Sequence, residues 1–413
     1  MSRRSGPDSV RRLMLFFAVV YTVEGIGQAK AGVIWQPLEY FLKTHIGWSS
    51  VQIAASLSVL DVPWIIKPVY GVISDFLPLF GYRRRSYLLL SNLAAGGAFF
   101  AVAHAMTPDA IVISLLLTSI AMAVSSTLCG ALLVENGQRY NASSAFVNQQ
   151  WLWFNAATAV AALLGGELIE LFSPAGALHV AALVAAVAPM AVLASLHLVN
   201  EAHAGIDRAE LRARLNGFLK TFRSRTLWMI AAFLFFYYYN PGFGTPLYFQ
   251  MTDHLGFSQG FIGALSAVSA LGWVTGGLLY RWLLADMSVL RMLRISIVFG
   301  TVSTLNFLFM KDPLSAVFVY FLVGAATMIA NVATLTLAAN HAPERAEGFA
   351  FAALMSVINL AAPLSDTSGA FLYQHLFGAH IAPLIILSAA FTAFALVLIP
   401  IFGIDRVELA RAA

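Results

Sequence analysis

The feature that most constrains this chain is a series of long apolar stretches separated by short polar turns. Crossing the hydrocarbon core of a bilayer as a helix takes about 20 mostly apolar residues. We predict twelve such spans, at about residues 13–41, 49–75, 86–106, 109–134, 144–171, 175–198, 226–250, 257–284, 289–310, 313–338, 346–375 and 379–402. The sequence therefore predicts an all-α membrane protein that crosses the lipid bilayer many times.

Composition supports this reading and removes several other classes. Hydrophobic residues make up 60% of the chain and charged residues only 11%, whereas a soluble domain carries about 25% charged residues. The net charge of +4 is small and scattered along the sequence, so we expect no nucleic-acid partner. The single cysteine, Cys129, excludes an internal disulfide.

The positions of lysine and arginine predict the orientation. If both termini share one side, that side holds 20 of the 24 basic residues, and the opposite side holds only Lys43 and Lys311. Basic loops face the cytoplasm, so we expect both termini there. Arginine outnumbers lysine 19 to 5, which is typical of a GC-rich bacterial source and favours the bacterial inner membrane.

A long polar stretch at residues 199–225 divides the chain. It predicts an N-terminal half at 1–198 and a C-terminal half at 226–413, each with six spans, and a cytoplasmic linker between them. Leu211, Leu215, Phe218 and Phe222 recur at helical spacing among basic residues, which predicts an amphipathic helix on the membrane surface. Two six-span halves are the plan of a secondary transporter, and we expect a monomer.

The end of the second span carries a motif that we interpret as a gate. Gly71 and Asp75 lie four residues apart on one helix face, and Arg83, Arg84 and Arg85 follow in the next turn. We predict that these five residues form a cytoplasmic gate, in which the Asp75 carboxylate binds arginine and latches the two halves together in one state. In the alternative, the arginines only anchor the loop on the cytoplasmic side.

The residues around this motif carry a family resemblance. Residues 64–87, WIIKPVYGVISDFLPLFGYRRRSY, resemble the cytoplasmic loop of major facilitator transporters and, more specifically, the folate–biopterin transporter family. Segments 240–249, 255–258 and 347–356 agree with the same family. The resemblance implies the major facilitator fold and a folate or pteridine cargo. Span 4 of this family carries acidic residues ahead of the position of Glu135, and the aligned positions here are Ser126 and Gly130.

Charged and polar residues inside the spans are the candidate site. An ionisable residue at the centre of a membrane helix costs about 2.5–3.5 kcal/mol on insertion scales and is a functional hypothesis by default. The predicted substrate-binding or coupling residues are Glu24, Gln28, Lys30, Asp61, Trp64, Lys67, Gln149, Trp153, Glu167, Tyr239, Asn359 and Asp366.

These side chains suit selective binding. A carboxylate can accept hydrogen bonds from an amino-pyrimidine edge, Lys30 or Lys67 can balance a substrate carboxylate, and the rings offer stacking surfaces. A buried acid such as Glu24 or Asp61 can carry a coupling proton. In the alternative, the lysines form structural ion pairs, for example Lys30 with Glu167, and the aromatic residues belong to the membrane interface.

Glycine and proline interrupt particular spans. Gly25, Gly27 and Gly32 predict a break in span 1, Pro63 and Pro68 in span 2, and residues 241–246 in span 7. Irregular backbone at membrane depth is tolerated only against protein or a wet cavity. Spans 1 and 7 begin the two halves, so their matching breaks point to the repeat interface as the site. Glu39, Glu135 and Glu170 lie near predicted span ends, where we expect solvation.

The leading interpretation is a secondary active transporter that moves a small organic solute by alternating access with a coupling proton; folate or a pteridine is one candidate cargo. A carrier for a different amphipathic metabolite or drug, and a non-transporting assembly factor with this fold, remain alternatives. The sequence shows no nucleophile–base pair, phosphate loop or metal-ligand spacing, so we expect no enzyme activity, no cofactor and no metal site.

Overall fold

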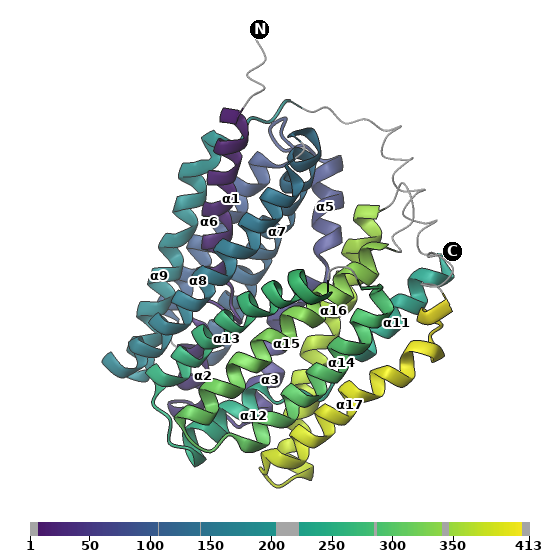
Figure 1. Ribbon diagram of the computed structural model, residues 1–413. Helices are drawn as coiled ribbons and strands as arrows, with labels where there is room; N and C mark the ends of the chain where they lie inside the picture. The colour runs from purple at the N-terminus through teal and green to yellow at the C-terminus, as the bar shows by residue number, and fades with distance from the viewer. Residues whose placement is uncertain are drawn as a thin grey trace. The chain divides into compact units, whose positions relative to one another are not determined.

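The structure of the protein, a computed structural model, is almost entirely helical. It describes residues 7–105, 107–140, 142–203, 223–284, 287–340 and 347–406. Within these ranges nine helices are long and apolar enough to cross a membrane, and Arg225–Tyr238 is a shorter apolar helix. The predicted multi-pass, all-α class is therefore confirmed (Figure 1). The expected amphipathic helix at 208–222 lies outside the described residues.

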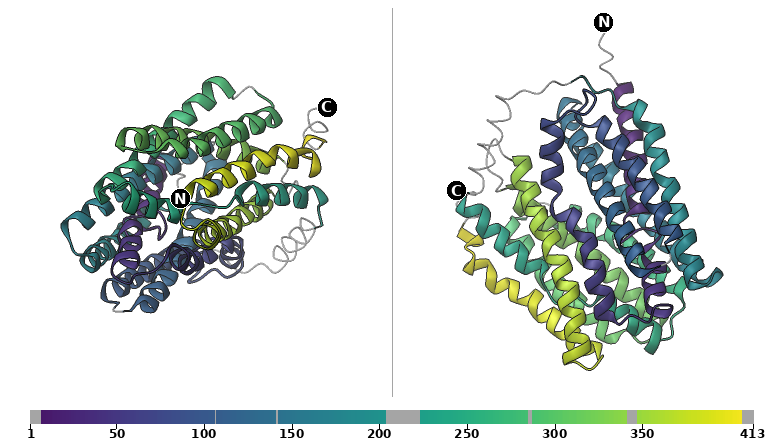
Figure 2. Two further views of the ribbon diagram at one scale, coloured as in Figure 1. Left: turned by 90° about the horizontal axis from the view of Figure 1, so that it is seen from below. Right: turned by 180° about the vertical axis from the view of Figure 1, so that it is seen from behind.

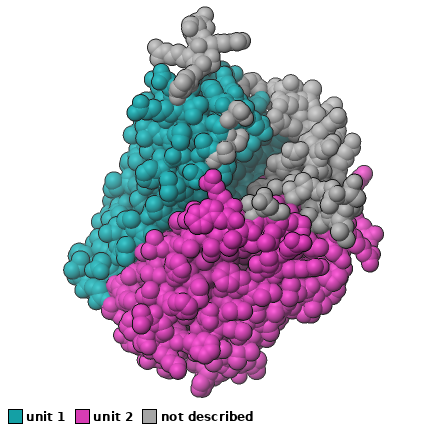
Figure 3. Space-filling view, in the orientation of Figure 1, with its two compact units in different colours: residues 1–47, 62–208 teal, residues 48–61, 209–413 magenta. Residues whose placement is uncertain are grey.

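The chain forms two compact units. The first comprises Met1–Gly47 and Val62–Arg208, and the second comprises Trp48–Asp61 and Ala209–Ala413 (Figure 3). The division near residue 208 falls inside the predicted linker, and Trp48–Asp61 groups with the second unit. The assignment of all residues 1–198 to one functional half stays a prediction.

The first unit is a bundle built around long helices. Its helices are α1 (Pro7–Gly27), α2 (Trp35–Thr44), α4 (Val62–Ile65), α5 (Lys67–Phe76), α6 (Arg85–His104), α7 (Pro108–Tyr140), α8 (Ser143–Leu171) and α9 (Pro174–Ser195), followed by the short 3-10 turn η2 (Leu196–Leu198). Helix α6 packs against α7 and α9, and α1 packs against α7, α8 and α9 (Figures 1 and 2). Phe17 and Phe146 meet edge to face at 5.0 Å in the core of this unit.

The second unit holds the remaining elements. They are α3 (Ser50–Ser58), η1 (Val59–Asp61), α11 (Arg225–Tyr238), α12 (Gly244–Phe249), η3 (Gln250–His254), α13 (Gln259–Leu279), η4 (Tyr280–Leu284), α14 (Val289–Leu305), η5 (Asn306–Phe309), α15 (Pro313–Asn340), α16 (Glu347–Phe371), η6 (Leu372–Leu376) and α17 (Ile381–Ile401). Helices α13 and α15 approach closely because side chains are missing: a Cβ at Gly272 or Gly276 would strike the backbone of α15. Small residues four apart allow such close packing of membrane helices.

The predicted second span is a chain of short helices. Helix α3 begins at a capping box formed by Ser49 and Gln52 and packs against α12 and α16. Helices α4 and α5, by contrast, pack against α7. Pro68 stands at the start of α5, where the missing N–H costs no helical hydrogen bond.

Spans 1 and 7 are broken where the sequence predicted. Helix α1 ends at Gly27 and α2 begins at Trp35; α11 ends at Tyr238 and α12 begins at Gly244. In span 1 the intervening turn is closed by backbone bonds, for example from Val33 N–H to the Ile26 carbonyl at 3.0 Å. Gln28 and Lys30 lie in the first of these breaks, and Tyr239 lies in the second.

Candidate functional site

The first unit contains a polar relay formed by three helices. Ser126 on α7 donates its hydroxyl hydrogen to Glu24 Oε1 on α1 at 2.9 Å. Lys67, the first residue of α5, donates from Nζ to the same hydroxyl oxygen at 3.0 Å. A hydroxyl can donate once and accept twice, so Ser126 bridges the carboxylate and the ammonium. We call Glu24, Ser126 and Lys67 the buried relay.

Two further side chains fix the lysine end of the buried relay. The Lys67 ammonium lies 4.5 Å from the ring centroid of Trp64, a cation–π contact. The indole N–H of Trp64 donates to Ser119 Oγ at 3.0 Å. Trp64 therefore presents a flat ring beside the only lysine of span 2, held in place by a bond to α7.

The Glu24 carboxylate of the buried relay can accept a further hydrogen bond. Glu24 is 8% exposed, and its second oxygen, Oε2, is buried without a hydrogen-bond partner among the described residues. A buried acceptor without a partner is costly. A donor from a bound solute would satisfy it, and a proton on this oxygen would remove the buried negative charge.

The break in span 1 places two predicted residues beside the end of α1. Gln28 and Lys30 lie in the turn between α1 and α2, both half-buried. The Lys30 ammonium lies 5.9 Å from the ring centroid of Trp35, the first residue of α2. The turn therefore joins a cation to an aromatic face at the start of a helix.

The break in span 7 is held by uncharged groups of the backbone and of side chains, among them a bond from Asn240 Nδ2 to Thr392 Oγ1 at 3.1 Å. Gly242 N–H donates to the Ser365 carbonyl on α16 at 3.0 Å, and the Ser365 hydroxyl donates to the Asn240 carbonyl. A Cβ on Gly369 would overlap the backbone of Gly242, and a Cβ on Gly242 would touch the Asp366 carboxylate. Asp366 therefore lies directly at this break.

Tyr239, the residue that follows α11, packs against an aromatic ring of that helix. It stacks on Phe235 at 5.7 Å, with an angle of 6° between the rings. Both rings line a hollow of about 680 Å³ between α11 and α16, together with Leu364, Thr367, Ser368, Phe371 and Leu372. Asp366 does not line this hollow, so the predicted residues Tyr239 and Asp366 do not share it.

The remaining predicted residues are not gathered into one cluster. On α8, the Trp153 indole N–H donates to Gln149 one turn earlier, and both Trp153 and Glu167 are exposed. Asp61 ends η1, Asn359 lies on α16, and both are half-buried. Of the twelve predicted binding or coupling residues, the structure brings Glu24, Trp64 and Lys67 together most closely.

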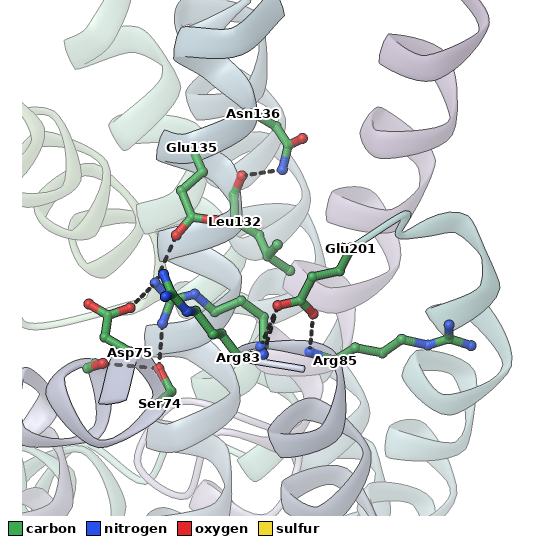
Figure 4. A network of polar contacts seen from close by, with 10 residues as sticks. Ser74, Asp75, Arg83, Arg85, Leu132, Glu135, Asn136 and Glu201 are labelled. Carbon is green, nitrogen blue, oxygen red and sulfur yellow. Dashed lines mark hydrogen bonds and ion pairs between the residues drawn. The ribbon is translucent and has the colours of Figure 1, made fainter. Parts of the chain in front are cut away.

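Two of the five predicted gate residues, Asp75 and Arg84, belong to a second polar network, shown in Figure 4. Arg84 is 5% exposed, and its Nη2 lies 2.5 Å from Asp75 Oδ1 and 2.8 Å from Glu135 Oε1. Its Nη1 donates to the Ser74 hydroxyl. These four residues, Ser74, Asp75, Arg84 and Glu135, are called the arginine network below.

The charge of Arg84 is secured by its partners. Burial lowers the pKa of its guanidinium, but the negative charges of Glu135 and Asp75 outweigh burial and raise that pKa above the usual arginine value. Arg84 therefore stays protonated at any pH at which the protein is handled. All these contacts lie within the first unit, and the predicted latch between two halves stays a prediction.

Sequence reasoning missed several residues and misjudged one. Ser126 was noted only as a departure from the family, and Asn240 only as part of a family segment. Ser119 and Ser365 carried no signal because a lone serine in a span is common. Glu39 was expected to be solvated, but it is buried, with 5% exposure, because its face of α2 lies inside the bundle. Glu135, expected at a solvated end, is more than half exposed yet pairs with Arg84.

Solved structures with the same fold place the chain in a class. It resembles a D-xylose–proton symporter with a TM-score of 0.72 at 13% identity, covering 94% of this chain and 97% of that one. It resembles a nucleoside transporter with a TM-score of 0.69 at 15% identity, covering 96% and 98%. The chain therefore has the major facilitator fold.

Relatives in sequence then give the family. The chain is 28% identical to a folate-biopterin transporter of Synechocystis, over 87% of this chain and 74% of that protein. It is 26% identical to folate transporter 2 of Plasmodium falciparum, over 83% and 77%. The BT1 family model matches residues 27–400, so the chain belongs to the BT1 family. It is a multi-pass membrane transporter of a small solute, and not an enzyme.

Proposed function

We propose that this transporter carries a folate- or pteridine-like solute by alternating access and that a proton moves with it. The observation that carries the proposal is the buried relay, in which Ser126 bridges Glu24 and Lys67 at 2.9 and 3.0 Å. The names of the relatives supply the solute class.

The chemistry of the relay suits an anionic, planar solute. Lys67 can pair with a solute carboxylate, and the neighbouring Trp64 ring can stack on a flat heterocycle. When a carboxylate reaches Lys67, Glu24 is no longer needed to balance the ammonium. A proton on Glu24 then removes a buried negative charge, so solute binding and proton uptake favour each other. Asp61 and Asp366 are further candidate carriers of the proton.

The arginine network is the proposed cytoplasmic gate, together with Gly71, Arg83 and Arg85. Helix α5 runs from Lys67 in the buried relay to Asp75 in the arginine network. A change at the relay can therefore reach the gate through a single helix of ten residues. The proposal also includes cytoplasmic termini, on the basis of the 20 basic residues assigned to one side, and a bacterial inner membrane, on the basis of the excess of arginine over lysine. It includes a monomer, as expected for a transporter with two six-span halves.

A second candidate function is transport of another amphipathic metabolite or drug. It is favoured by Ser126 and Gly130, which stand where the family carries acidic residues. A Cβ at Gly130 would meet no atom within 4 Å, so that position offers space in place of a charge. A cargo with a different charge or a bulkier group would suit this difference.

The test is uptake of radiolabelled folate and biopterin into proteoliposomes, with and without an imposed pH gradient. We expect gradient-stimulated uptake in the wild-type protein and its loss in Glu24→Gln and Asp61→Asn. Absence of uptake of both compounds by well-folded protein would reject the folate and pteridine proposal and leave the second candidate. Uptake that ignores the gradient would reject proton coupling.

A further inference from the structure

The first turn of α6 begins without a cap of its own. Its N-cap residue is Arg84, whose side chain makes no capping hydrogen bond. The first N–H groups of a helix have no partner within the helix, and the helix dipole leaves partial positive charge at this end. This turn therefore needs an acceptor from elsewhere in the chain.

Glu201 supplies that acceptor from the start of the central linker, just after η2. Its Oε1 accepts the backbone N–H groups of Arg83 and Arg84, both at 2.9 Å, and its Oε2 accepts that of Arg85 at 2.8 Å (Figure 4). Hydrogen bonds to a carboxylate are about twice as strong as those between neutral groups. One side chain, more than 110 residues away in sequence, thus holds three successive amides.

His203 makes a second contact with the same turn. Its ring lies 4.5 Å from that of Tyr82. It also occupies the space that a Cβ on Gly81 would take, and Gly81 has a φ of +79°. The Arg85 guanidinium lies 5.9 Å from the Tyr82 ring. Residues 81–85 are therefore docked on residues 201 and 203.

Arg84 belongs to both sets of contacts. Its backbone N–H is bound by Glu201, while its guanidinium reaches Asp75, Glu135 and Ser74. We propose that Glu201 is a positioning residue of the gate: by fixing the backbone at Arg83–Arg85, it sets the guanidinium of Arg84 between Asp75 and Glu135. The start of the linker is then a working part of the gate. The inference deepens the proposed function, since it assigns a controlling residue to the proposed gate.

Hydrogen exchange separates positioning from simple capping without any transport measurement. In the full-length protein in nanodiscs, we expect Glu201→Ala to speed exchange of peptides covering residues 83–87 at least tenfold. If Glu201 positions Arg84, the last turn of α5, residues 72–77, should also exchange at least threefold faster, because Asp75 loses its partner. Arg84→Ala should speed α5 equally, and the double variant should speed it no further.

Two further variants serve as controls for the exchange experiment. Asp109→Asn removes an acid from the first turn of another helix, α7, and should leave both peptides at the wild-type rate. Glu201→Gln keeps an acceptor oxygen and should give smaller changes of the same kind, which matters if Glu201→Ala does not fold. Faster exchange at 83–87 with an unchanged α5 would overturn the positioning role, as would additive effects of Glu201→Ala and Arg84→Ala on α5.

Transport kinetics test whether Glu201 acts on the gate through Arg84. With a solute that the wild-type protein carries, we expect Glu201→Ala to lower kcat several-fold with KM unchanged, and to have no effect in an Arg84→Ala background. An equal loss in both backgrounds would contradict the inference. Absence of folate or biopterin uptake by the wild-type protein bears on the proposed function alone, because the exchange readout needs no cargo.

Discussion

Spans 1 and 7 are both broken and both breaks are closed in part by backbone bonds, but the side chains around them differ. Near the break after Gly27, side chains from three helices meet, and Ser126 bridges the charges of Glu24 and Lys67. At the break after Tyr238, uncharged groups meet: Gly242 N–H binds the Ser365 carbonyl, the Ser365 hydroxyl binds the Asn240 carbonyl, and Gly369 lies against Gly242 without a side chain between them.

The two breaks differ in what can change their contacts. Side-chain bridges can change with protonation or with a bound solute, whereas a glycine-to-glycine contact depends on shape alone. The first unit therefore has titratable chemistry at its break, and the second has close packing with one carboxylate, Asp366, beside it. Substitutions at the first break should accordingly affect function as well as stability, whereas those at the second should act mainly on folding.

The largest expected effect is at Gly369. A methyl group there would overlap the Gly242 backbone, and overpacking of this kind costs about 3 kcal/mol. We expect Gly369→Ala to lower the apparent melting temperature strongly in a thermal-shift assay in detergent. Gly244→Ala is the matched control, since a Cβ there meets nothing within 4 Å. Equal melting temperatures for the two variants would show that the contact does not hold this break.

Removing Lys67 should have the next largest effect. Lys67→Met leaves the buried Glu24 carboxylate without the cation that it reaches through Ser126, and leaving a buried charge uncompensated costs about 3 kcal/mol, less where solvent reaches it. Adding Glu24→Gln should recover most of the lost stability, because no buried charge then remains. If the double variant melts below the single one, the two residues are not coupled through Ser126.

Ser126→Ala should cost less than either of these changes. It removes the bridging hydroxyl and leaves both charged partners in place, a loss of about 1–2 kcal/mol. We expect a modest fall in melting temperature and a clear change in the pH dependence of uptake. Thr127→Val is the control, since the Thr127 hydroxyl bonds only to its own helix, at Ala123. Identical pH profiles for Ser126→Ala and wild type would remove Ser126 from the coupling site.

The smallest effect should come from Trp153. Its indole bonds within its own helix to Gln149 on an exposed face of α8, and it belongs to neither break. Trp153→Phe should change stability by less than about 0.5 kcal/mol and leave uptake near the wild-type rate. A several-fold rise in KM would return Trp153 to the binding site and weaken the focus on the two breaks.

These examples also show what the sequence could and could not predict. Spans and breaks are local properties, so apolar runs and the glycines at 25, 27 and 32 were sufficient to place them. Contacts between helices are not local: Ser126 and Glu24 are 102 positions apart, and Glu201 and Arg83 are 118 apart. Hydrophobicity gives the length of a span but not which faces meet. That is why Ser126 and Glu201 were missed and the burial of Glu39 was misjudged.

Paired assays on Glu24→Gln test most directly whether Glu24 carries the coupling proton. One assay is solute uptake driven by a pH gradient; the other is exchange of labelled for unlabelled solute across the same proteoliposome membrane without a gradient. The account predicts that Glu24→Gln loses gradient-driven accumulation and keeps exchange, because binding and movement of the two halves survive while proton coupling does not. Gradient-driven accumulation at the wild-type level in Glu24→Gln would contradict it.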